Sequence, residues 1–200
     1  MSMDKQKTFS IVKQYTIEKT AKDDIHGFSH ITRVLDLCLE IGKKLGANLH
    51  VLEIAALLHD IGRESENQDI HNRNHAELSA EMSLVFLRSQ DFQISQDELD
   101  NIIHCIRAHS FSNKTIPKSL EAKILSDVDK LDALGAIGLY RVIGFTIKKK
   151  GKIEQVIEHL EDKILKLRDQ LYLEESRKIA DERKQIIINF YNKLKQESSI

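Results

Sequence analysis

One apolar stretch of the sequence ends on two side chains that bind metal ions well. The residues Ala-Ala-Leu-Leu at 55–58 are followed directly by His59 and Asp60. An imidazole and a carboxylate carried into a hydrophobic core lose their hydration, and a divalent cation bound by both compensates for that loss. We therefore interpret this doublet as part of a metal site. The alternative is a hydrogen-bonded core histidine beside a polar residue at a helix end.

Similar side chains recur where other hydrophobic segments begin or end. They are His30, His75, His109 and the aspartates at 127, 129 and 132. Each of these residues alone could have a structural role as readily as a functional one. Their recurrence at the ends of hydrophobic helices is improbable if they serve only to stabilise the core. The sequence thus predicts a metal centre to which four separate segments contribute: His30, the doublet, His75 or His109, and one of the aspartates.

The periodicity of apolar residues predicts the helices that must position these side chains. They cover about 9–22, 30–45, 49–60, 75–89, 96–109, a segment after Pro117 that reaches about 132, 133–147, 153–171 and 174–195. His30 begins the second predicted helix and the doublet ends the third. The polar stretch 63–74 is expected to be a loop, long enough to cover the site.

The composition favours an all-α protein. A single proline and eight glycines accompany 41% hydrophobic and 30% charged residues, which suits helices better than strands and turns. At 200 residues the chain is long enough for one sizeable core, so we expect a single domain. Within it we place the metal-site core at about 23–145 and a helical layer at about 151–197, which would pack outside the core or form an oligomer contact.

Charge and cysteine usage exclude several other classes of protein. Thirty basic and thirty-one acidic residues leave a net charge of -1, which does not favour binding to a nucleic-acid polymer or an anionic membrane. The sequence has neither a signal-peptide pattern nor the roughly 20 apolar residues of a membrane span. Cys38 and Cys105 lie too far apart for a thiol redox or zinc motif. A cytoplasmic protein that acts on a small molecule is expected.

Three segments, taken in order, resemble the HD superfamily of metal-dependent phosphohydrolases. They are His30 in His-Ile-Thr-Arg-Val, His59-Asp60 in Leu-Leu-His-Asp-Ile-Gly, and Asp129 in Asp-Val-Asp-Lys-Leu-Asp. Segments 107–112, 120–127 and 131–138 are also similar to a small bacterial and archaeal subgroup of predicted HD hydrolases. The resemblance implies an HD-type helical bundle that hydrolyses a nucleotide or another phosphate ester.

The resemblance also implies a ligand set. Residues two apart on a helix point roughly 200° from each other, so Asp127 and Asp129 cannot both face one ion. Related enzymes use the aspartate that precedes a basic and an apolar residue, which is Asp129 here. In members with two metals, extra histidines occupy the places of His75 and His109, and Asp60 would bridge the ions. One-metal members use these places to bind phosphate instead.

The expected chemistry is hydrolysis by water that one or two divalent ions activate, with Mn, Fe, Ni, Co or Zn all suited to these ligands. Arg63 and Lys130 are candidates to hold the substrate phosphate. By resemblance Glu64 would orient water or protonate the leaving group, although its register differs by about one residue. The alternatives are a di-iron oxygenase that uses the same ligands, and a nucleotide-binding module without turnover.

Overall fold

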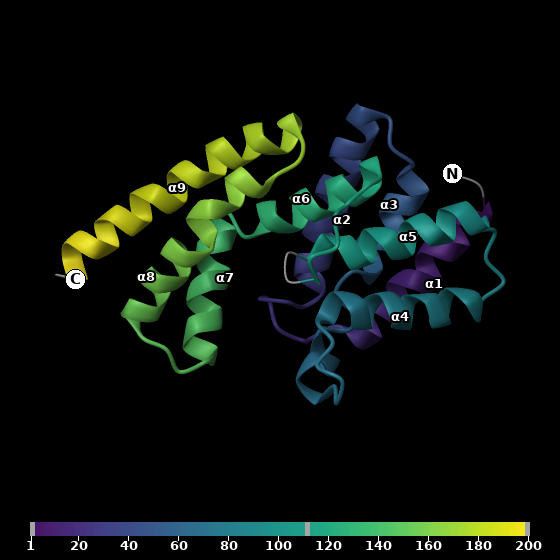
Figure 1. The fold of residues 1–200 in the computed structure, drawn as a ribbon, viewed down its shortest axis with the longest axis horizontal. Helices are drawn as coiled ribbons and strands as arrows, with labels where there is room; N and C mark the ends of the chain where they lie inside the picture. The colour runs from purple at the N-terminus through teal and green to yellow at the C-terminus, as the bar shows by residue number, and fades with distance from the viewer. Residues whose placement is uncertain (1–2, 111–112, 199–200) are drawn as a thin grey trace. The chain divides into compact units, whose positions relative to one another are not determined.

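The structure, a computed structural model, describes residues 3–110 and 113–198 and has no strand among them (Figure 1). The elements are α1 (Met3–Lys19), α2 (Phe28–Leu45), α3 (Leu49–Leu58), the 3-10 helix η1 (Arg63–Gln68), α4 (His75–Arg88), α5 (Gln96–His109), α6 (Leu120–Asp132), α7 (Gly135–Lys148), α8 (Ile153–Asp162), the 3-10 helix η3 (Ile164–Gln170) and α9 (Glu174–Ser198). The predicted all-α class is confirmed. None of the described helices is both long and apolar enough to cross a membrane.

The chain divides into two compact units, and the boundary falls inside α6, between Ser126 and Asp127. The first unit holds α1 to α5 and the first half of α6. The second unit holds the rest of α6 and the elements that follow it. The predicted metal-site core of 23–145 therefore does not coincide with either unit. That the chain acts as a single domain stays a prediction.

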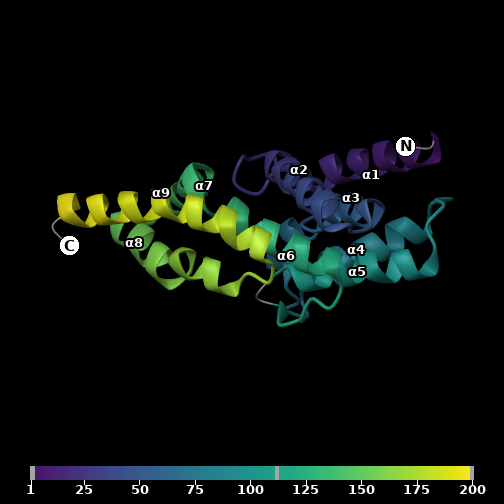
Figure 2. The same ribbon diagram turned by 90° about the horizontal axis from the view of Figure 1, so that it is seen from above.

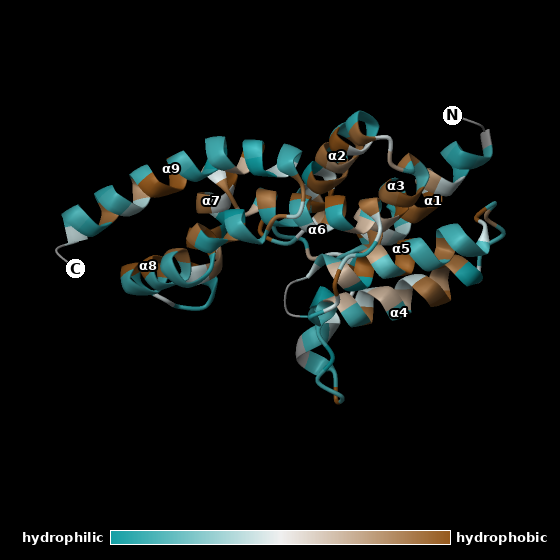
Figure 3. Ribbon diagram, turned by 45° about the horizontal axis from the view of Figure 1, so that its top comes forward, coloured by the Kyte–Doolittle hydropathy of each residue, from teal (hydrophilic) through white to brown (hydrophobic). Residues whose placement is uncertain are grey.

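Helix α3 is the centre of the first unit. Seven of its ten residues are apolar and at most 1% exposed: Val51, Leu52, Ile54, Ala55, Ala56, Leu57 and Leu58. Figure 2 shows α3 between α1 and α2 on one side and α4 and α5 on the other, and Figure 3 colours it brown over most of its length. A helix that is hydrophobic all round must be buried. Whatever follows the last turn of α3 is thereby delivered into the interior of the unit.

Local capping explains why several predicted helix ends agree with the structure. The Asn48 side chain accepts hydrogen bonds from the backbone of His50 and Val51, which satisfies two free N–H groups at the start of α3. Ser95 and Glu98 form a capping box at the start of α5. Such caps are visible in the sequence, and α5 covers the predicted residues.

Three predicted elements were partly wrong. Helix α1 begins at Met3 and ends at Lys19, earlier at both ends than predicted. The polar stretch 63–74 begins with η1 rather than being a loop throughout. The predicted helix 153–171 is α8 followed by η3, and the two are separated at Lys163, whose φ is -126°. Apolar side chains keep helical spacing across that break, so periodicity alone could not reveal it.

The second unit packs α7, α8 and η3 against α9. Its buried apolar residues include Leu160, Ile164, Leu167 and Ile187. Asp127, at the start of this unit, accepts hydrogen bonds from the backbone N–H groups of Tyr172 and Leu173, both at 2.9 Å. This carboxylate thus fixes the segment that leads into α9.

Candidate metal centre

The turn after α3 places the His59-Asp60 doublet against α4. The carbonyl group of Leu57, in the last turn of α3, accepts a hydrogen bond from Thr16 of α1. The backbone N–H of Gly62 donates to the Ser79 hydroxyl on α4 at 2.9 Å. A Cβ atom at position 62 would lie only 2.5 Å from the Ser79 nitrogen, so only glycine permits this approach. The doublet is therefore held close to the N-terminus of α4, where His75 lies.

Four imidazoles converge on the carboxylate of Asp60. The Nε2 atoms of His30 and His59 lie 3.8 and 3.9 Å from its Oδ2 atom. The Nε2 atoms of His75 and His109 lie 3.7 and 3.5 Å from its Oδ1 atom. All five residues are at most 7% exposed. The carboxylate thus lies between two pairs of histidines, with one pair beside each of its oxygens.

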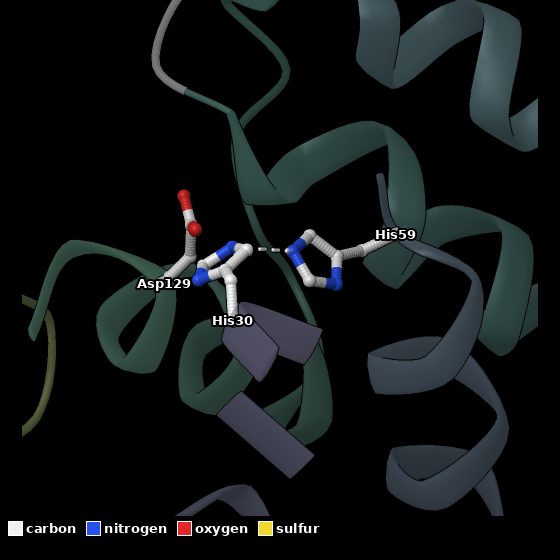
Figure 4. Close-up of side chains that lie close together, drawn as sticks. All are labelled: His30, His59 and Asp129. Carbon is white, nitrogen blue, oxygen red and sulfur yellow. Dashed lines mark hydrogen bonds between the residues drawn. The ribbon is translucent and has the colours of Figure 1, made fainter. Parts of the chain in front are cut away.

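The pair on the Oδ2 side is in direct contact. The Nε2 atoms of His30 and His59 lie 3.3 Å apart in hydrogen-bond geometry, and Figure 4 shows the two rings joined by a dashed line. His30 lies in the first turn of α2, as the sequence predicted, and the N-cap of that helix is Gly27. A cation bound by both nitrogens would replace the proton that they share.

The outer nitrogens of three rings show which tautomer each imidazole adopts. His59 and His109 place Nδ1 2.8 and 2.6 Å from the backbone carbonyl oxygen three residues earlier. His75 places Nδ1 3.2 Å from a carboxylate oxygen of Glu66. Carbonyl and carboxylate oxygens only accept hydrogen bonds, so each Nδ1 carries the proton and each Nε2 presents a lone pair. The inner nitrogens therefore face the oxygens of Asp60 as acceptors against acceptors.

This arrangement fits a divalent cation. The Nε2 atom of His109 is fully buried and has no hydrogen-bond partner among the described residues. His59, Asp60 and His109 each offer a ligand atom, and these atoms lie within 4.8 Å of one another. Buried lone pairs that face each other repel unless a positive charge lies among them. Imidazole nitrogens and carboxylate oxygens are the ligands of Mn, Fe, Co, Ni and Zn.

The electrostatics keep these groups in the forms that bind metal. Burial alone would raise the pKa of Asp60, but the guanidinium of Arg63 places Nε and a terminal nitrogen 2.7 and 2.9 Å from its two oxygens and acts in the opposite direction, and that pKa is held well below its usual value. Burial, followed by the charge of Arg63, lowers the pKa of His75. Asp60 is thus ionised and His75 neutral at pH 7, as metal ligands must be.

The first unit brings together five of the six predicted ligands, namely His30, His59, Asp60, His75 and His109. The sixth, Asp129, lies on α6 in the second unit, and its part in the site stays a prediction. Asp127, the alternative on the same helix, has both oxygens bound to backbone N–H groups. Phe111 and Ser112, from the segment 107–112 that resembles HD hydrolases, lie outside the described residues.

The residues predicted to handle the substrate are placed differently from one another. Arg63 forms a two-pronged ion pair with Asp60. Glu64 is exposed and makes no polar contact with the described part of the site. Lys130 is 7% exposed, and burial lowers its pKa while Asp129 acts in the opposite direction.

The sequence did not reveal Glu66, whose carboxylate contacts His75. The two residues are nine apart and belong to different elements, so no helical spacing connects them. The only signal was an acidic residue in the polar stretch after the doublet. Glu64 carries the same signal, and composition could not separate the two.

Comparisons with known proteins show the family and the fold of this chain. The family model described as HD domain matches residues 27–134. The protein YpgQ of Bacillus subtilis is 31% identical over 180 residues, which are 86% of this chain and 84% of YpgQ. The structure of YpgQ in complex with ADP has a TM-score of 0.75 at 26% identity and covers 98% of this chain and 97% of that one.

Two further solved structures share the fold. One is a Lactobacillus plantarum protein with a TM-score of 0.79 and 26% identity, covering 100% of this chain and 99% of that one. The other, described as a predicted HD superfamily hydrolase from an uncultured Thermotogales bacterium, has a TM-score of 0.66 and 27% identity and covers 96% of this chain and 91% of that one. The likeness thus extends over nearly the whole chain.

Proposed function

Because the chain belongs to the HD domain family, we propose that it is a metal-dependent phosphohydrolase that cleaves a nucleotide or another small phosphate ester. The observation that carries this proposal is the convergence of four imidazole nitrogens on the two oxygens of a buried, ionised Asp60. A purely structural carboxylate would be surrounded by hydrogen-bond donors, whereas three of these nitrogens, on His59, His75 and His109, present lone pairs beside the Arg63 ion pair. Buried lone pairs grouped around a carboxylate can bind a cation.

We further propose that the site holds two ions, with His30 and His59 on the Oδ2 side of Asp60 and His75 and His109 on the Oδ1 side. Asp129 is the sixth ligand in this proposal. Its support is local: Ser126, in the first unit, donates its hydroxyl hydrogen bond to the His109 carbonyl oxygen at 3.3 Å. Asp129 follows three residues later on the same helix, so it shares that face of α6.

The ions would supply hydroxide near neutral pH and polarise the phosphoryl group. The chain's own residues would hold and orient the substrate. Arg63 is 27% exposed and stands beside Asp60, which places positive charge at the edge of the site. We propose that Arg63 and Lys130 attract the phosphate, because a guanidinium or ammonium stabilises the negative charge that grows on the phosphoryl oxygens.

The nucleotide is the first substrate class to test. The relative YpgQ, which this chain matches over most of its length, has been solved in complex with ADP. We therefore propose that a nucleoside phosphate enters the site with its phosphates toward Asp60. A net charge of -1 for the whole chain leaves such an anion dependent on local positive charge.

The test is turnover by protein that has been stripped with a chelator and reloaded with Mn²⁺. We expect the reloaded protein to hydrolyse at least one nucleoside mono-, di- or triphosphate, and we expect this hydrolysis to require the ion. The variant Asp60→Asn should lose the activity. The matched control is Glu40→Gln, which removes an exposed carboxylate on α2 of the same unit. Turnover that persists in Asp60→Asn, or without any ion, would contradict the proposal.

A further inference from the structure

The two sides of Asp60 differ in what supports their histidines. His59, on the Oδ2 side, and His109, on the Oδ1 side, rest Nδ1 on neutral backbone carbonyls. His75, also on the Oδ1 side, instead donates Nδ1–H to the carboxylate of Glu66. An ionised acceptor forms a stronger hydrogen bond than a carbonyl oxygen does. His75 is thus supported by a charge that belongs to a separate element, η1.

One oxygen of Glu66 fixes both the ring and the backbone of His75. The Oε1 atom accepts a hydrogen bond from the backbone N–H at 2.9 Å and from Nδ1 at 3.2 Å. The ring is thereby turned so that its Nε2 atom lies 3.7 Å from Oδ1 of Asp60. The side chain of Glu66 is 36% exposed, so it contacts the site from its edge.

A carboxylate behind a histidine ligand does two things. It fixes the tautomer with the proton on the outer nitrogen, and it increases the electron density on the inner nitrogen, which strengthens the bond to a metal. Removal of such a partner typically lowers metal affinity about 10–100-fold. Because Glu66 contacts His75, its effect should fall on the Oδ1 side of Asp60.

We propose that Glu66 is a positioning residue that sets the affinity for the ion on the Oδ1 side, and thereby determines whether the chain holds one ion or two. This inference rests on the proposed function and deepens it. It assigns no proton transfer to Glu66. In the structure its carboxylate acts on the site through the imidazole of His75.

The experiment is a titration of chelator-treated protein with Co²⁺, in which calorimetry and the visible absorption of the bound ion measure the binding. Wild type is compared with Glu66→Gln, and Glu40→Gln is the control for the loss of one carboxylate in the first unit. The glutamine keeps an oxygen that can accept the backbone hydrogen bond of His75, so the local anchor survives. His75→Ala identifies which binding step belongs to the Oδ1 side.

We expect wild type to bind two ions and Glu66→Gln to bind the Oδ1-side ion about 10–100-fold more weakly, with the other ion within about twofold of wild type. His75→Ala should weaken the same step further. A melting temperature close to that of wild type, measured by circular dichroism, shows that the variant is folded. A variant that loses thermal stability but keeps both affinities assigns Glu66 a purely structural role and overturns the inference.

The outcomes separate this inference from the proposed function. Two ions with equal affinities in wild type and Glu66→Gln overturn the role of Glu66 alone. One ion in wild type overturns the inference and the two-ion arrangement, but leaves a one-metal phosphohydrolase in place. No ion in wild type overturns the proposed function itself.

Discussion

Two buried carboxylates, Asp60 in the first unit and Asp127 in the second, have opposite surroundings. Asp127 is fully buried and accepts one backbone N–H on each oxygen, both at 2.9 Å. Asp60 is 2% exposed and faces the inner nitrogens of four histidines, and Arg63 donates to both of its oxygens. Burial alone therefore does not mark a functional carboxylate, whereas the type of atom that surrounds it does.

The largest expected effect is that of Asp60→Asn. The amide cannot supply the negative charge between the two pairs of histidines, so we expect metal affinity to fall by more than about 100-fold. That loss exceeds the one expected when a residue that only hydrogen-bonds to a metal ligand is removed. Turnover should disappear with the metal. Metal content per chain and phosphate release measure the two losses. Full metal content in a folded variant would contradict the claim that Asp60, unlike Asp127, binds metal.

The next effect concerns Asp129. If this residue is the sixth ligand, Asp129→Asn should lower metal affinity at least about tenfold and change the free energy of unfolding little. Equilibrium dialysis with Mn²⁺ and urea unfolding measure the two quantities. An unchanged affinity would remove Asp129 from the ligand set and leave the five residues of the first unit.

Asp127→Asn should show the reverse pattern. Its amide places an N–H₂ group against a backbone donor, which leaves a buried donor unsatisfied and should cost about 1–3 kcal/mol in the free energy of unfolding. Metal affinity should stay within about twofold of wild type. Should this variant lose the metal and keep its stability, Asp127 rather than Asp129 would be the ligand on α6.

The smallest effect is a difference in pH dependence, measured by urea unfolding with chelator present. The pKa of Asp60 is held well below its usual value because burial, which would raise it, is opposed above all by the charge of Arg63. Its contribution to stability is therefore present above about pH 4 and is lost as the pH falls. The pKa of Asp127 is raised by burial, so its contribution is present at low pH and is lost as the pH rises.

Between pH 3 and 6, the stability difference between wild type and Asp60→Asn should thus grow with pH, and that between wild type and Asp127→Asn should shrink. In each difference, the pH dependence that comes from carboxylates shared by the variant and wild type cancels. Two differences that change in the same direction would show that the environments of the two carboxylates are more alike than the contacts indicate.

The sequence revealed the parts of this site that local pattern determines. The doublet stands out because polar side chains follow an apolar helix, and helical spacing alone predicted a helix over 96–109, where α5 lies. His30 is visible because helical spacing resumes with the residues that follow it. In each case the signal lies within one element.

The remaining features depend on contacts between distant elements. Asp127 is bound to backbone groups 45 and 46 residues away, and no spacing rule connects them. Glu66 meets His75 because η1 turns the chain back toward α4. Arg63 was predicted to hold phosphate. Its bidentate ion pair with Asp60 depends on the turn after α3, which the sequence alone does not specify.

The most direct measurement is anomalous diffraction from crystals of the protein soaked with Mn²⁺. We expect a peak beside each oxygen of Asp60, one within coordination distance of His30 and His59 and the other within that distance of His75 and His109. A map without a peak among these five side chains, from crystals in which Mn²⁺ is bound elsewhere, would contradict it.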